Sequence, residues 1–262
     1  MAASPSGSVH GELQRLLDDA YSRYARRMFV ESDPVQVPHR FSDGRDVEIS
    51  ALLVASIAWG NRRSILASMD SLLGLMDDSP YDFVMCFGPA EERRLEGFVH
   101  RTFNAVDAVA FMRSLRNVYR HHGGLRGVFA EGYRRSGDVV GALRHFRQVF
   151  CDGDFPQRSG KHVANVDAGA AAKRLNMFLR WMVRPSREGI DFGLWPEIPT
   201  SALLLPLDVH TSRVARSLGL LSRRQNDLRA VLELTEALRQ FDPVDPVRYD
   251  FALFGLGVNG VL

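Results

Sequence analysis

The sequence lacks the features of a membrane protein, a secreted disulfide-bonded fold or a cysteine-held metal site. The longest apolar run of its 262 residues lies around residues 51–59 and is too short to cross a bilayer. Residues 1–8 are small and polar with no apolar core behind them, which indicates an unstructured end rather than a signal peptide. Cys86 and Cys151 are the two cysteines, too few for a four-thiolate metal site. We therefore expect a cytoplasmic protein with free thiols.

Signatures of the common enzyme classes are also missing. The chain has no P-loop, no dinucleotide-binding glycine pattern, no nucleophile elbow and no zinc-protease motif. Nucleotide hydrolysis, hydride transfer and metalloprotease chemistry therefore have no support in the sequence.

Positive charge is concentrated in two stretches, although the formal net charge is only +2. Eight arginines lie between residues 113 and 147 against two acids, and six basic residues lie between 158 and 184 against Asp167 alone. A surface that follows a phosphate backbone needs such stretches. They are equally typical of solvated helix faces, so charge alone leaves both interpretations open.

The spacing of apolar residues is helical along nearly the whole chain, and no segment alternates as a strand would. Asn104 with Asp107 forms a capping box, Asp208 is a good N-cap, and Pro246 suits a first helical turn. The sequence therefore predicts an all-α fold in a single unit, residues 9–262, with helices at 10–29, 46–59, 62–77, 90–98, 104–121, 124–135, 138–149, 167–184, 208–218, 224–240 and 246–256.

Two connections are too long and too rich in proline to be helical. Residues 185–206 are largely apolar, whereas residues 31–46 are polar and are expected to wrap the surface or a cleft. The second connection carries acids and a histidine, so a metal site is one alternative, although the ligands have no tight spacing. The residues concerned are Asp33, His39, Asp43 and Asp46.

A lysine and an aspartate stand out at two expected helix starts. The apolar residues of 167–184 form one stripe, and Lys173 lies on the opposite side with Met177, Arg180 and Arg184. The positive end of the helix and the neighbouring cations favour a neutral, nucleophilic amine. Taken alone, Asp208 is best explained as a helix cap, and His210 and Arg213 as surface residues.

Together these segments resemble a known superfamily. A lysine early in one helix, followed by Leu-Asp-x-His and Arg-Val, is similar to the catalytic half of the helix-hairpin-helix (HhH-GPD) DNA glycosylases. More specifically, the chain resembles DUF2400, a bacterial family of unknown function within that superfamily, in KRLNMFLRWMVR (173–184), DFGLW (191–195), PLDVHTSRVARSLGL (206–220) and YDFALFGLGV (249–258).

The resemblance implies two helical lobes with DNA in the cleft between them. One lobe would comprise residues 47–184, and the other residues 9–46 plus 185–262. Lys173 matches the lysine that forms a Schiff base, and Asp208 matches the catalytic aspartate. The implied function is excision of damaged bases from duplex DNA, with strand cleavage through the lysine, and no cofactor or iron–sulfur cluster is expected.

The chain departs from the superfamily at the hairpin and in spacing. The usual Leu-Pro-Gly-x-Gly hairpin is missing, so Lys161 in Ser159-Gly160-Lys161 stays a second candidate nucleophile. Lys173 and Asp208 are 35 residues apart, which is wider than usual. A similar widening in an archaeal 8-oxoguanine branch favours oxidised purines as the substrate.

Further residues are candidates for contacts with DNA and with a flipped base. Residues 242–250 are typical of a helix start, from which Tyr249 and Asp250 could also reach the cleft. An extruded base needs an aromatic platform, although each aromatic residue is equally a candidate for the core. The expected DNA contacts are Asn61, Lys161, Arg174, Arg180, His210 and Arg213, and the expected platform residues are Trp59, Trp181, Phe192 and Trp195.

Two alternatives remain open from the sequence. A non-catalytic nucleic-acid-binding protein could keep the fold without excising bases, and its DNA binding would be salt-sensitive. A helical protein-interaction or small-molecule protein would instead use the connection 31–46 and would not retain DNA.

Overall fold

The computed structural model describes residues 5–260, which are mostly helical. Residues 1–4, half of the stretch expected to be unstructured, lie outside the described part, and the first helix already begins at Pro5. The α-helices are α1 (Pro5–Tyr24), α2 (Met28–Ser32), α3 (Gly44–Ser56), α4 (Arg62–Leu75), α5 (Pro80–Cys86), α6 (Pro89–Arg94), α7 (Ala105–His121), α8 (Gly124–Ser136), α9 (Val139–Phe150), α10 (Lys173–Val183), α11 (Val209–Ser217), α12 (Leu228–Arg239) and α13 (Tyr249–Val258).

Short 3-10 turns and one small hairpin complete the secondary structure. Strands β1 (Val99–His100) and β2 (Phe103–Asn104) form an antiparallel pair. The 3-10 turns are η1 (Pro34–Gln36) and η2 (Pro38–Arg40) in the first long connection, η4 (Thr200–Ala202) in the second, and η3 (Gln157–His162) and η5 (Pro246–Arg248) elsewhere.

The prediction of an all-α protein is confirmed, and most helix boundaries fall within a few residues of those expected. The capping box of Asn104 and Asp107 is present at the start of α7. Helix α5 was not expected, and the helix expected from residue 167 begins only at Lys173. Ala172 has a left-handed backbone with φ 49°, which a continuing helix does not allow.

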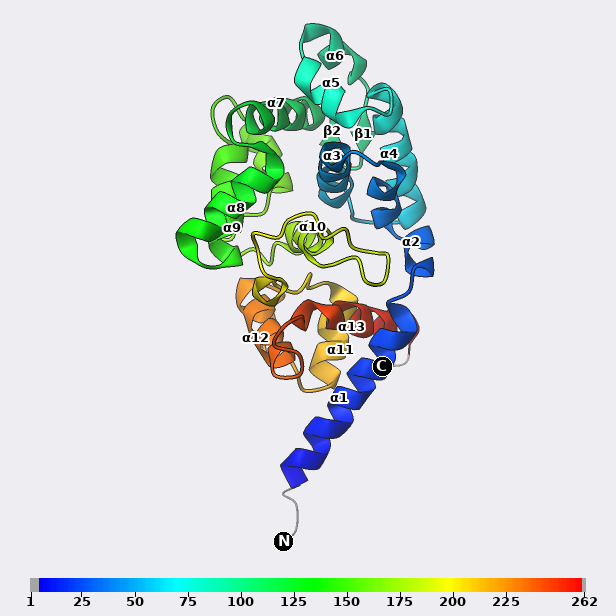
Figure 1. The fold of residues 1–262 in the computed structure, drawn as a ribbon. Coiled ribbons are helices and arrows are strands. Elements are labelled where there is room, and N and C mark those ends of the chain that lie inside the picture. Colours follow the sequence, from blue (N-terminus) through cyan, green and yellow to red (C-terminus); the bar gives the residue numbers. More distant parts are fainter. Residues whose placement is uncertain (1–4, 261–262) are drawn as a thin grey trace.

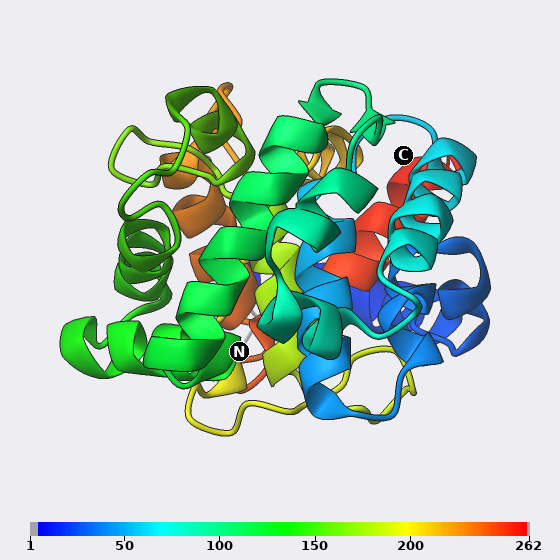
Figure 2. The same cartoon turned by 90° about the horizontal axis from the view of Figure 1, so that it is seen from above.

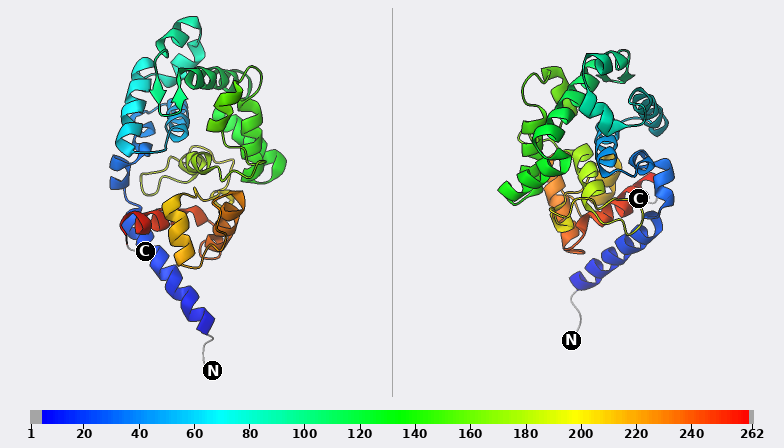
Figure 3. Two further views of the ribbon diagram at one scale, coloured as in Figure 1. Left: turned by 180° about the vertical axis from the view of Figure 1, so that it is seen from behind. Right: turned by 45° about the horizontal axis from the view of Figure 1, so that its top comes forward.

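Helix α10 lies at the centre of the molecule. Helices α3 to α9 lie on one side of it, and α11, α12 and α13 lie on the other (Figures 1 and 3). Seen from above, α7 crosses the middle, between α4 on one side and α8 with α9 on the other (Figure 2). Because neighbours cover α10 on both sides, Phe178, Leu179, Trp181 and Met182 are all fully buried.

The N-terminal helix and the last helix pack together although they are far apart in sequence. Helix α1 packs along α13, and α13 also packs on α11. This brings residues near positions 29, 208 and 250 to the same end of α10. No helix within residues 5–260 combines the length and the apolar character needed to span a membrane.

Candidate active site

Lys173 and Asp208 meet in one cavity. The Lys173 Nζ lies 3.4 Å from Asp208 Oδ2, with the lysine side chain 38% exposed and the aspartate side chain 13% exposed. Asp208 is the N-cap of α11, where its Oδ1 accepts a hydrogen bond of 2.8 Å from the Thr211 backbone amide. The cap therefore holds one carboxylate oxygen, and the other faces the amine.

The cavity has a volume of about 630 Å³, which is within the range of small-molecule sites. Its wall comes from five separate parts of the chain: residues 29–34, residues 58–65, residues 173–180 of α10, residues 206–210, and residues 250–258 of α13. A substrate in this space would therefore contact segments that are far apart in the sequence.

Charged groups of both signs line this cavity. Arg62, Lys173, Arg174 and Arg180 supply cations, and Asp33, Asp208 and Asp250 supply carboxylates. Burial raises the pKa of Asp250 to about 6, against the opposing effect of the nearby Arg180 guanidinium. Burial also raises the pKa of Asp33, although its Oδ1 accepts a 3.0 Å hydrogen bond from the Val35 amide.

Aromatic rings form another part of the wall. Trp59 is only partly buried, and its ring is held by the Arg174 guanidinium, 4.8 Å from the ring centroid, and by His162, stacked at 5.7 Å. Phe29, Phe251 and Phe254 line the same space. Such surfaces are able to stack on a planar ligand.

The sequence matches one protein family. The model of the family "Protein of unknown function (DUF2400)" matches residues 33–259. The chain belongs to the DUF2400 family. No curated protein and no solved structure matches the chain.

Three of the four expected platform residues of this DUF2400 protein lie outside the cavity. Trp181 and Trp195 are fully buried, and the Trp195 indole donates to Glu48 Oε1 at 2.7 Å. Phe192 packs against His39 with ring centroids 4.4 Å apart. Trp59 alone of the four faces the cavity, because Trp181 and Trp195 lie on the sides of their segments that pack into the core.

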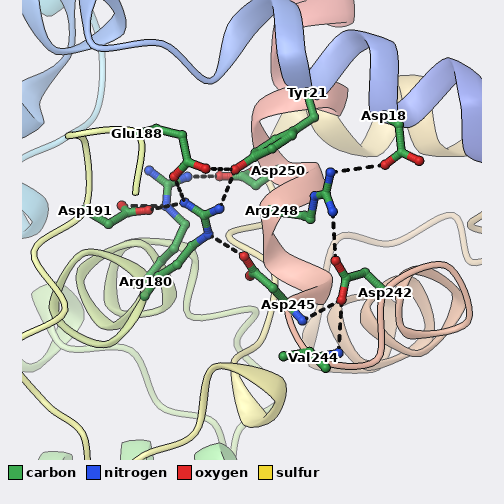
Figure 4. Close-up of polar contacts among 11 residues, drawn as sticks. Asp18, Tyr21, Arg180, Glu188, Asp191, Asp242, Val244, Asp245, Arg248 and Asp250 are labelled. Atoms are coloured by element: carbon green, nitrogen blue, oxygen red, sulfur yellow. Dashed lines mark hydrogen bonds and ion pairs between the residues drawn. The ribbon is translucent and has the colours of Figure 1, made fainter. Parts of the chain in front are cut away.

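Arg180 was expected on an exposed basic face, but the structure places it in a buried ion-pair cluster (Figure 4). Its guanidinium pairs with Asp250 and, at 3.3 Å, with Asp191. Arg184, which is 2% exposed, bonds Asp191, Glu188 and Asp245 at 2.8–3.1 Å. Helical periodicity puts both arginines opposite the apolar stripe, but α13 and residues 188–191 cover that side as well.

The other expected DNA contacts lie at different distances from the cavity. Arg174 and His210 line it. Asn61 is exposed and caps α4 beside the lining residues Gly60 and Arg62. Arg213 donates to the Gly257 carbonyl at 3.3 Å, and Lys161 is exposed on η3, and neither lines the cavity.

Most arginines of the basic stretch 113–147 are engaged in ion pairs or hydrogen bonds. Ion pairs join Arg113 to Glu92, Arg126 to Glu197 and Arg144 to Asp167, and two more arginines pair with Glu131. Arg147 bonds the carbonyls of residues 160 and 163. The net charge of this stretch therefore overstates the positive surface that it presents.

The four residues of the alternative metal site are used separately. Asp33 and Asp43 cap η1 and α3, and Asp46 accepts from the Tyr81 amide at 2.7 Å. His39 Nε2 contacts the Ile190 carbonyl at 2.8 Å. Within residues 5–260 no group of three or more potential ligands is arranged to hold a metal ion.

Sequence reasoning placed Asp250 near the cleft but missed Phe29, Asp33, Arg62 and Phe254 as cavity residues. These residues come from α2, η1, α4 and α13, and no local spacing connects them. The proline-rich character of residues 31–46, expected to wrap a surface or a cleft, was the one signal that pointed to Asp33.

Proposed function

We propose that this protein is a DNA base-excision glycosylase that acts on oxidised purines and cleaves the strand through a lysine Schiff base. The observation that carries the proposal is the contact between Lys173 and Asp208 inside a cavity large enough for a nucleoside. In this proposal the helices on either side of α10 are the two lobes of an HhH-GPD fold, and duplex DNA lies across the cleft between them.

The pair supplies the two functions that excision requires. Lys173 attacks C1′ of the damaged nucleotide as the neutral amine, and Asp208 takes up the proton that the nitrogen loses once it has bonded to C1′. The bond from C1′ to the base breaks, its electron pair leaves with the base, and the base takes up a proton from solvent. While the C1′–base bond breaks, Asp208 is still ionised, and its negative charge near C1′ stabilises the cationic sugar in the transition state. The C1′–O4′ bond then opens, O4′ takes up a proton, and the resulting imine permits β-elimination of the 3′ phosphate.

The position of the pair supports this division of labour. Lys173 is the first residue of α10, and its Nζ reaches the Asp208 carboxylate from there. The cap on α11 fixes the Asp208 carboxylate while leaving Oδ2 free to face the amine. Trp59 and Phe254 offer stacking surfaces that offset part of the cost of extruding a base, which is about a few kcal/mol.

Borohydride trapping tests the proposal directly. Full-length protein is incubated with duplexes that carry 8-oxoguanine or one of a panel of other damaged bases, and borohydride reduces any imine to a stable covalent adduct. We expect an adduct with the wild type, none with Lys173→Gln, and an unchanged adduct with Lys161→Gln. Lys161 is the matched control because it is exposed and outside the cavity.

The other outcomes each exclude something specific. An adduct that persists in Lys173→Gln and disappears in Lys161→Gln would move the nucleophile to η3. Absence of adduct and of base release across the whole panel would remove the enzymatic proposal. If salt-sensitive DNA retention then remained unchanged in Lys173→Gln, the protein would be a non-catalytic binder.

A further inference from the structure

Two carboxylates in the cavity have no task in the excision step. Asp33 and Asp250 line the same space as the catalytic pair, and each is only 8% exposed. A buried carboxylate costs free energy unless its oxygens find donors, so two of them facing one cavity call for an explanation.

Each carboxylate is held by one oxygen. The Arg180 guanidinium donates to Asp250 Oδ2, and the Val35 amide donates to Asp33 Oδ1. Within residues 5–260 no donor is found on Asp250 Oδ1 or Asp33 Oδ2. An ionised carboxylate oxygen only accepts hydrogen bonds, so this part of the wall presents acceptors to a ligand.

Arg180 is engaged by two carboxylates. Its Nε faces Asp191, its Nη1 binds Asp250, and its guanidinium lies 4.2 Å from the Phe251 ring centroid. It is 3% exposed and lines the cavity, and the ion pair with Asp250 fixes that carboxylate in the wall. The Lys173 side chain, by contrast, is flexible and 38% exposed.

We infer that Asp250 and Asp33 select the base, by accepting hydrogen bonds from a ring edge that carries adjacent N–H donors. This inference rests on the proposed function and names its specificity. A 2-amino-6-oxopurine, guanine or its 8-oxo form, offers the ring N1–H next to the exocyclic amine. Uracil and thymine place carbonyl oxygens on both sides of their ring N–H, and adenine places a bare ring nitrogen beside its amine. Those acceptors would face carboxylates, and the mismatch excludes them.

Calorimetric titration of full-length protein with two nucleosides tests the inference without needing catalysis. The probes are 8-oxo-2′-deoxyguanosine and 8-oxo-2′-deoxyinosine, which differ only in the exocyclic amine. We expect the wild type to prefer the guanosine by roughly tenfold to a hundredfold, the gain from one charge-assisted hydrogen bond. Asp250→Asn should reduce that preference to nearly none, and Asp33→Asn should reduce it in part.

Asp191→Asn is the matched control. Asp191 shares Arg180 with Asp250 and is also buried, but it does not line the cavity. It should therefore disturb the ion pairs while leaving the preference intact. Thermal unfolding checks that each variant folds, and Asp33→Asn carries the test if Asp250→Asn does not.

Several results would overturn the inference: binding of neither nucleoside, equal affinity for the two, or a preference that survives in both cavity variants. Loss of the preference in Asp191→Asn as well would assign it to the ion-pair cluster instead. The outcome is separable from that of the proposed function. If a borohydride adduct forms but the two nucleosides bind equally, the proposed enzyme is retained and the role of Asp250 and Asp33 in base selection is rejected. If 8-oxo-2′-deoxyguanosine is preferred but no adduct forms, base selection is retained and the proposed enzyme is rejected.

Discussion

The two halves of α10 carry the same kind of residues and use them in opposite ways. At the N-terminal end, Lys173 is 38% exposed and has one carboxylate neighbour at 3.4 Å. At the C-terminal end, Arg184 is 2% exposed and its donors meet four groups, among them the Tyr21 hydroxyl at 2.7 Å. A cation whose hydrogen bonds are all used is structural, and one left partly unpaired beside a cavity is available for chemistry.

Arg180 lies at the boundary between these halves. It lines the cavity, yet its guanidinium is committed to Asp191 and Asp250. Asp250 therefore belongs both to the buried ion-pair cluster and to the cavity wall. The ion pairs near the C-terminal end of α10 hold this hydrogen-bond acceptor in place in the cavity. Three predictions concern α10, from its buried C-terminal end (the sealed end) to its partly exposed N-terminal end (the open end).

The largest effect is expected from breaking the sealed end. Arg184→Met keeps an unbranched side chain but leaves Asp245 without its ion-pair partner and Asp191 with Arg180 alone, and burial already raises the pKa of Asp245. Removing one member of a buried ion pair costs about 3–5 kcal/mol, and we expect that loss in the free energy of unfolding measured with urea. Arg187→Met, at an exposed neighbour, should change it by less than about 0.5 kcal/mol. A loss below about 1 kcal/mol in Arg184→Met would contradict a structural role for the cluster.

An intermediate effect is expected from pH at the boundary. The pKa of Asp250 is raised to about 6, chiefly by burial, with opposing contributions from Arg180 and Lys173 and further raising ones from Asp208 and Asp191. The carboxyl is therefore ionised above that pH and protonated below it. A protonated carboxyl is a poorer acceptor, so affinity for 8-oxo-2′-deoxyguanosine should fall about tenfold between pH 7 and pH 5. The titration should flatten in Asp250→Asn, and an unchanged slope in that variant would assign the effect to another group.

The sequence predicted most of the helices because their signals are local. Caps such as Asn104 and Asp208 act within one turn, and the apolar stripe of α10 includes residues that are indeed buried. Residues 168–172 (AGAAA) suit a helix by composition, but the left-handed backbone at Gly169 and Ala172 delays its start. Helix α5 is seven residues long, too short for a periodic pattern.

The candidate site was predictable only where a resemblance supplied the long-range contact. Lys173 and Asp208 are 35 residues apart, and nothing in their local patterns joins them. The burial of Arg180 and the placement of Asp33 in the cavity depend on α13 and η1 packing against α10. Periodicity describes one helix at a time, so it could not show that both faces of α10 are covered.

The smallest effect is expected from substitutions at the open end. The contact between Lys173 and Asp208 is partly exposed, and ion pairs of this kind contribute about 0–1 kcal/mol. Lys173→Gln and Asp208→Asn should therefore each change the free energy of unfolding by less than about 1 kcal/mol, because Asn caps a helix about as well as Asp. Both should nevertheless lose the borohydride adduct or form it far more slowly. Destabilisation by more than about 2 kcal/mol in either variant would make the pair part of the scaffold, since an interaction that stabilises the fold so strongly is not one held open for a substrate.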